Sequence, residues 1–123
     1  MNGTPRESLE ARVAELRSEA IDAMGVLTGD VSACARARDG QSFPAYKLHE
    51  GRYAAATSLH RELRSAADAD VPGLVEHAWE TWQAEQERRA SQSRDWQAYA
   101  AGGLETVTQL RELLGGSSST GAP

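Results

Sequence analysis

Three histidines, His49, His60 and His77, are the side chains of this sequence best suited to binding a metal ion. A zinc-protease site places two histidines four residues apart, and a ferritin-type di-iron site places a glutamate three residues before a histidine. Here the histidines are 11 and 17 residues apart, and none has a glutamate three residues before it. An 11-residue spacing still returns close to the same helix face. A small metal- or ligand-binding enzyme that uses these histidines with nearby carboxylates is therefore kept as an alternative.

The other reactive side chains do not form a catalytic pattern. A catalytic nucleophile needs an activating base. Cys34, the single cysteine, lies on the apolar stripe of the first predicted helix, where we expect a buried thiol. Gly102-Gly103 lacks the lysine and the serine or threonine that complete a phosphate-binding loop. We therefore expect a protein that is not an enzyme, with no metal and no other cofactor.

Aromatic residues flank a polar stretch, 83–95, whose apolar residues are Ala84 and Ala90. Tryptophan and arginine are favoured at the centres of protein interfaces, and both types gather here. The candidate interface comprises Trp79, Trp82, Arg88, Arg89, Arg94, Trp96 and Tyr99. Packing of the same tryptophans in the core is the alternative explanation.

Charge is distributed unevenly along the sequence. The net charge is −5, but residues 36–64 carry six basic against three acidic side chains. A basic flank on the second predicted helix consists of Lys47, Arg52, Arg61 and Arg64. Weak binding of nucleic acid through this flank is a further alternative, although an acidic protein neutralises few phosphates and so binds them poorly.

Helix signals cover most of the sequence. Thr4-Pro5-Arg6-Glu7 has the form of a capping box, and Leu9, Val13, Leu16, Ala20, Ala23 and Leu27 follow at alternating spacings of four and three. A second helix is predicted from Pro44 to about Ala67, and Asp70 is the expected N-cap of the next. The apolar residues from Val75 to Leu114 keep one heptad phase, which favours one long helix, whereas Gly102-Gly103 weakens the middle of such a helix. Residues 72–114 therefore form either one helix or two.

The length of 123 residues corresponds to one domain. We expect an all-α protein: an antiparallel bundle of three or four helices over residues 1–114, with a flexible, disordered Gly/Ser-rich tail over 115–123. No apolar run is long enough for a membrane helix, and we expect a cytoplasmic protein with no membrane partner. Long amphipathic helices commonly bury residual apolar surface between subunits. The predicted function is therefore a non-enzymatic protein–protein interaction or regulatory module that self-associates, as a homodimer.

Overall fold

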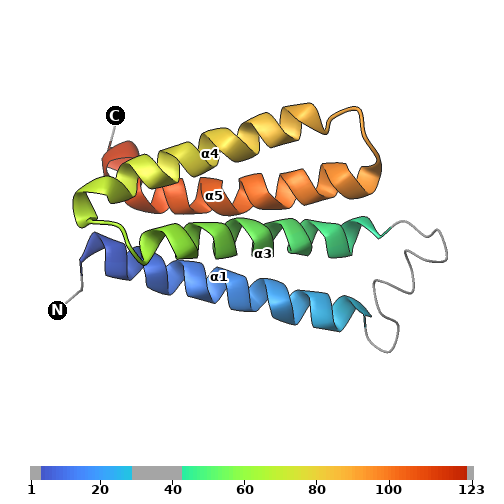
Figure 1. The fold of residues 1–123 in the computed structure, drawn as a ribbon, viewed down its shortest axis with the longest axis horizontal. Helices are drawn as coiled ribbons and strands as arrows, with labels where there is room; N and C mark the ends of the chain where they lie inside the picture. The colour runs from blue at the N-terminus through green and yellow to red at the C-terminus, as the bar shows by residue number, and fades with distance from the viewer. Residues whose placement is uncertain (1–3, 29–42, 122–123) are drawn as a thin grey trace.

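Four α-helices form the protein over the residues described by a computed structural model, 4–28 and 43–121 (Figure 1). Within these ranges there is no strand. The elements are α1 (Pro5–Thr28), α3 (Pro44–Leu63), the short 3₁₀ helix η1 (Asp68–Asp70), α4 (Val71–Arg88) and α5 (Arg94–Gly121). The all-α prediction is confirmed, and of its two forms the four-helix one is correct. Cys34 lies outside the described residues.

Helix α1 begins at the predicted capping box. The Glu7 backbone N–H donates to Thr4 Oγ1 at 3.2 Å, and the Thr4 backbone N–H donates to Glu7 Oε1 at 3.1 Å. The two side chains thereby satisfy two backbone donors that have no partner inside the helix. A local sequence signal therefore fixes the point at which the chain enters the bundle.

Replacing Thr4 by alanine removes the acceptor for the Glu7 backbone N–H and should lower the free energy of unfolding by about 1 kcal/mol. Urea denaturation followed by circular dichroism measures this change. Ser8→Ala is the matched control, because Ser8 is exposed one turn further along α1 and its substitution should change stability by less than about 0.5 kcal/mol. Equal effects of the two substitutions would contradict the cap.

The hydrophobic core draws on all four helices. The predicted stripe of α1 is buried at Leu9, Val13, Leu16 and Ala20, whereas Ala23 and Leu27 are half-buried. The main cluster comprises Leu9, Val13 and Leu16 of α1, Ala56, Leu59 and Leu63 of α3, Val71 and Val75 of α4, and Leu110 of α5. These residues come from the start of α1 and α4 and from the later parts of α3 and α5. The core therefore lies toward the end of the bundle where the described chain begins (Figure 1).

Helices α3 and α5 run in the same direction and pack directly against each other, although successive helices are antiparallel (Figure 1). A Cβ atom on Gly51 would lie 1.9 Å from the Tyr99 carbonyl oxygen, and one on Gly102 would lie 2.0 Å from the Leu48 carbonyl oxygen. Glycine permits such a close approach because it has no side chain. Gly102-Gly103, which the sequence marks as a weak point of a long helix, is buried inside α5, where both residues allow close packing.

Helices α4 and α5 are separate, which answers whether residues 72–114 form one helix or two. The Trp96 backbone N–H lies 3.4 Å from Ser93 Oγ at the start of α5. The Gln97 side-chain amide donates to the carbonyl oxygens of Ala90, at 3.1 Å, and Gln92, at 2.8 Å. Side chains thus satisfy backbone groups that a turn leaves open. The polar stretch 83–95 therefore contains the end of α4, a turn and the start of α5. The regular spacing of apolar residues from Val75 to Leu114 continues across this turn although the helix does not.

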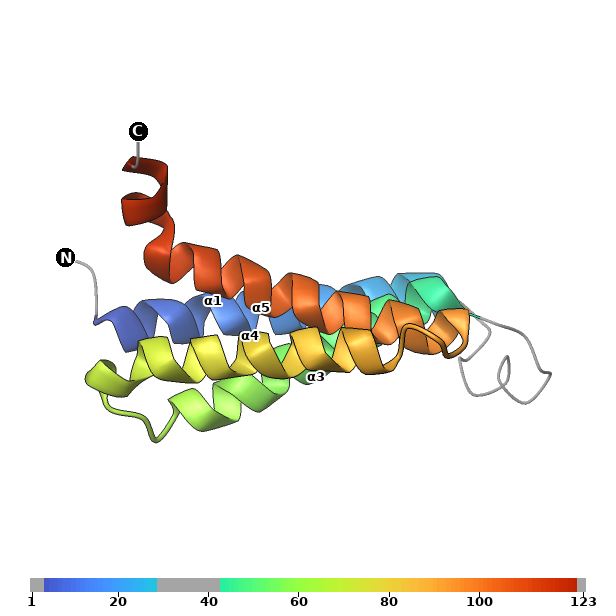
Figure 2. The ribbon, with the colours of Figure 1, turned by 90° about the horizontal axis from the view of Figure 1, so that it is seen from above.

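Two helix ends differ from their predicted positions. Helix α3 ends at Leu63, and Ala67 is extended, with φ −78° and ψ 153°, just before η1. Asp70 is the N-cap of α4 as predicted, without a side-chain capping hydrogen bond. Helix α5 continues past Leu114 to Gly121, and its final turns bend away from the bundle (Figure 2). The predicted domain boundary at Leu114 and the flexible tail over 115–123 stay predictions.

Candidate functional site

Three aromatic side chains meet beside the turn between α4 and α5. Trp82 lies on α4, and Trp96 and Tyr99 lie three residues apart on α5. The Tyr99 ring centroid is 5.6 Å from that of Trp82 and 5.4 Å from that of Trp96. We call these three residues the aromatic cluster. The antiparallel pairing of α4 and α5 brings them together, and the cluster spans from a half-buried Trp82 to Trp96, which is 38% exposed.

Two cations pack on the exposed end of the aromatic cluster. Arg89 Cζ lies 4.4 Å from the ring centroid of Trp96 and 5.9 Å from that of Tyr99. Lys47 Nζ, from α3, lies 4.5 Å from the Trp96 centroid and 2.8 Å from Glu50 Oε1. Each cation–π contact contributes about 0.5–1 kcal/mol at an exposed site. The Trp96 indole is therefore held in place although more than a third of it faces solvent.

The pKa values of Glu85 and Tyr99 are both shifted in this region, in opposite directions. Burial alone would raise the pKa of Glu85, but hydrogen bonds from Arg88 and Arg89 outweigh burial and lower it. Burial raises the pKa of Tyr99, and the nearby charges of Glu50 and Glu85 raise it further. The Tyr99 hydroxyl is therefore neutral at physiological pH and the Glu85 carboxylate is ionised. Neither shift brings the pKa of its group closer to 7, so neither group is tuned for proton transfer at neutral pH.

The other members of the predicted interface lie apart from the aromatic cluster. Trp79 packs under Arg111 of α5, whose Cζ is 4.0 Å from its ring centroid, and Arg111 Nε lies 2.8 Å from Glu76 Oε1. Arg88 is exposed and bonded to Glu85. Arg94 lines a separate hollow with Pro44 and Gln97. Of the seven predicted residues, four lie together: Trp82, Arg89, Trp96 and Tyr99. Lys47 of α3 joins them at the exposed end, beside Trp96.

The predicted basic flank on α3 is divided. Lys47 pairs with Glu50, and Arg52 Nε lies 3.5 Å from Glu105 Oε1 of α5. Arg61 and Arg64 are exposed and, within the described part of the chain, form no ion pair with a carboxylate. Only half of the flank therefore presents uncompensated charge.

The three histidines do not converge on a common point. His49 and His60 are half-buried on α3, but their 11-residue separation places them about 16 Å apart along the helix axis. His77 is exposed on α4. Burial, followed by the charge of Arg52, lowers the pKa of His49, while Glu105 raises it. Among residues 4–28 and 43–121, no three His, Cys, Asp or Glu side chains are grouped so as to hold a metal ion. The alternative histidine site is therefore not formed.

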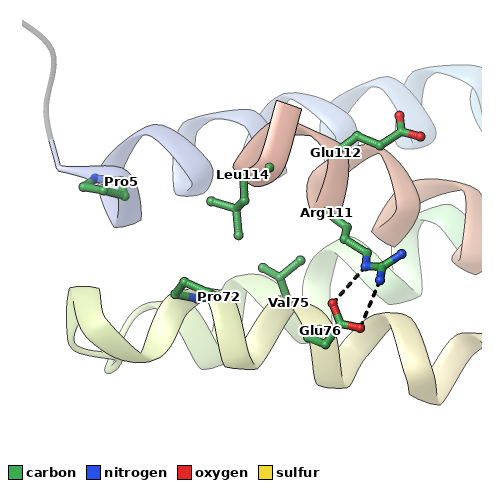
Figure 3. A pocket seen from close by; sticks show the side chains of 8 residues that line it. Pro5, Pro72, Val75, Glu76, Arg111, Glu112 and Leu114 are labelled. Atoms are coloured by element: carbon green, nitrogen blue, oxygen red, sulfur yellow. Dashed lines mark hydrogen bonds and ion pairs between the residues drawn. The ribbon is translucent and has the colours of Figure 1, made fainter. Parts of the chain in front are cut away.

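An apolar groove lies between the starts of α1 and α4 and the later part of α5 (Figure 3). It has a volume of about 670 Å³, and Pro5, Pro72, Val75 and Leu114 surround it. The bidentate pair of Arg111 and Glu76 stands at its edge (Figure 3). No motif in the sequence signals this groove, because its walls come from the starts of α1 and α4 and the later part of α5.

The helices and side chains define a four-helix bundle with an aromatic and cationic surface at one end. No family model, curated protein or solved structure matches the chain. In the described part of the chain, no helix is both long enough and apolar enough to cross a membrane.

Proposed function

We propose that this protein is a non-enzymatic interaction module that self-associates as a homodimer through the aromatic cluster and Arg89. The observation that carries the proposal is Trp96: a large indole that is 38% exposed and yet held by Arg89 and Lys47. An ordered aromatic side chain loses little conformational freedom when a partner covers it. Tryptophan and arginine also contribute most to binding at interface centres.

A homodimer is the favoured assembly because a twofold axis brings the same patch together twice. In such an interface each Trp96 packs against the aromatic cluster of the other subunit, and the Arg89 and Lys47 of both subunits surround the two indoles. A cytoplasmic location is part of the proposal, supported by a sequence with a single cysteine, Cys34, which cannot form an intramolecular disulfide.

Light scattering after size exclusion, over a wide range of protein concentration, tests the proposal. The wild-type protein should have twice the mass of one chain, and Trp96→Ala should shift the protein to monomer because the central indole is lost. Leu113→Ala is the matched control: Leu113 is 54% exposed, but it lies 17 residues further along α5, about 25 Å away, and should leave the mass unchanged.

Two results would overturn this assignment. A wild-type protein that stays monomeric at high concentration removes self-association. A dimer that Trp96→Ala leaves intact, with unchanged circular dichroism, removes this surface as the interface.

A further inference from the structure

A shallow groove runs along α3 from the aromatic cluster. Its volume is about 470 Å³, and Lys47, Glu50, Tyr53, Ser58 and Arg61 line it, with Trp96 of α5 beside Lys47. The 14 residues from Lys47 to Arg61 span about 21 Å of helix. The groove is therefore long, and most of its lining is polar or aromatic.

Positive charge exceeds negative charge in and around this groove. Lys47 and Arg61 line it, and the Arg17 guanidinium of α1 lies 5.5 Å from the Tyr53 ring centroid. Glu50 is the carboxylate in the lining, and it is paired with Lys47. Arg17 and Arg61 form no ion pair with a carboxylate within residues 4–28 and 43–121. This local excess of cations stands out in a protein with a net charge of −5.

Hydroxyl groups add hydrogen-bond donors between the charged ends of the groove. Tyr53 and Ser58 are both in the lining. The pKa of the Tyr53 hydroxyl is lowered, chiefly by Arg17 beside it and then by Thr57. Guanidinium and hydroxyl donors along one line are suited to carboxylates that are spaced along a chain.

We propose that the groove binds an extended acidic segment of a partner protein. The inference rests on the proposed function of an interaction module and specifies the chemistry of a partner. An extended chain advances about 3.3 Å per residue, so six or seven residues match the 21 Å span.

Charge complementarity also favours an acidic peptide over nucleic acid. A protein binds a nucleic-acid backbone tightly only when its lysine and arginine side chains neutralise many phosphates at once. The groove offers few cations, with hydroxyl groups between them, and this set suits a few carboxylates better than a phosphate backbone. A short segment of consecutive carboxylates meets the cations of the groove and the hydroxyl groups between them.

Fluorescence anisotropy of a labelled octa-glutamate peptide at low salt tests the inference. The wild-type protein should bind the peptide, and Arg61→Gln should weaken binding about fivefold because it removes one charged contact. Arg64→Gln is the matched control, since it removes the same charge from an exposed residue of the same segment that does not line the groove. An octa-glutamine peptide should not bind.

Three outcomes would overturn the inference. Absence of octa-glutamate binding removes it directly, and the proposed function still stands if Trp96→Ala converts the dimer to monomer. If Arg61→Gln and Arg64→Gln weaken octa-glutamate binding equally, the peptide is attracted by the overall charge of the segment and does not bind in the groove. Tighter binding of an oligothymidylate of equal length assigns the surface to nucleic acid.

Discussion

Gly51→Ala is expected to lower the free energy of unfolding by about 3 kcal/mol, the upper part of the range for overpacked interiors. The added Cβ atom would lie 1.9 Å from the Tyr99 carbonyl oxygen. That oxygen belongs to the backbone of α5, so no rotation of a side chain relieves the clash and the two helices must move apart. Because the whole stability of such a domain is roughly 5–15 kcal/mol, this loss is a large fraction of it.

Gly73→Ala is the matched control for this experiment. Gly73 is also helical, but a Cβ atom there would meet nothing within 4 Å. Alanine at that position should raise stability by about 0.5–1 kcal/mol, because it restricts the unfolded chain. Urea denaturation of both variants measures the difference. If Gly51→Ala were as stable as Gly73→Ala, the close approach of α3 and α5 would be wrong.

The close packing of α3 and α5 also shows what sequence patterns do not contain. The capping box at Thr4 and the stripe from Leu9 to Ala20 are readable because each depends on residues within a few turns of one helix. Gly51 and Gly102 are 51 residues apart, and their role depends on which two helices meet. Without that knowledge, propensity assigns a glycine inside a helix a cost of about 1 kcal/mol. Tertiary packing reverses this assignment.

The candidate site has the same division between local and long-range information. Trp96 and Tyr99 share a helix face because they are three residues apart, which the sequence predicts. The cation partners are different: Lys47 reaches Trp96 from α3, and Arg111 covers Trp79 from α5. Those pairs follow from the order of helices in the bundle. The sequence therefore identifies the residue types of the site. It predicts Trp79 and Trp82 in one interface, whereas in the structure Trp79 contacts Arg111 and Trp82 contacts Tyr99.

Trp82→Ala should lower the free energy of unfolding by about 3 kcal/mol, since it removes a large ring that packs between the helices. The ring lies over Gly103, where a Cβ atom would be 2.2 Å from Trp82 Cε3. It also lies beside Tyr99, with ring centroids 5.6 Å apart. Thermal or urea unfolding measures the loss. If Trp82 acted at a subunit interface alone, the substitution would change the solution mass and leave the stability of the monomer unchanged.

A double-mutant cycle separates this packing from a general loss of hydrophobic surface. Gly103→Ala alone should cost about 2 kcal/mol, because the new methyl group collides with the indole. With Trp82→Ala in the same chain, the methyl group enters space that the indole has left. The double variant should therefore lose about 1–2 kcal/mol less unfolding free energy than the two single variants lose in sum.

Trp79→Ala combined with Gly103→Ala is the matched control. The three atoms nearest to the added Cβ all belong to Trp82, so the losses from Trp79→Ala and Gly103→Ala should simply add. Additivity in both cycles would mean that the Trp82 ring does not rest on Gly103, and the tryptophan would then be free to serve the surface rather than the core.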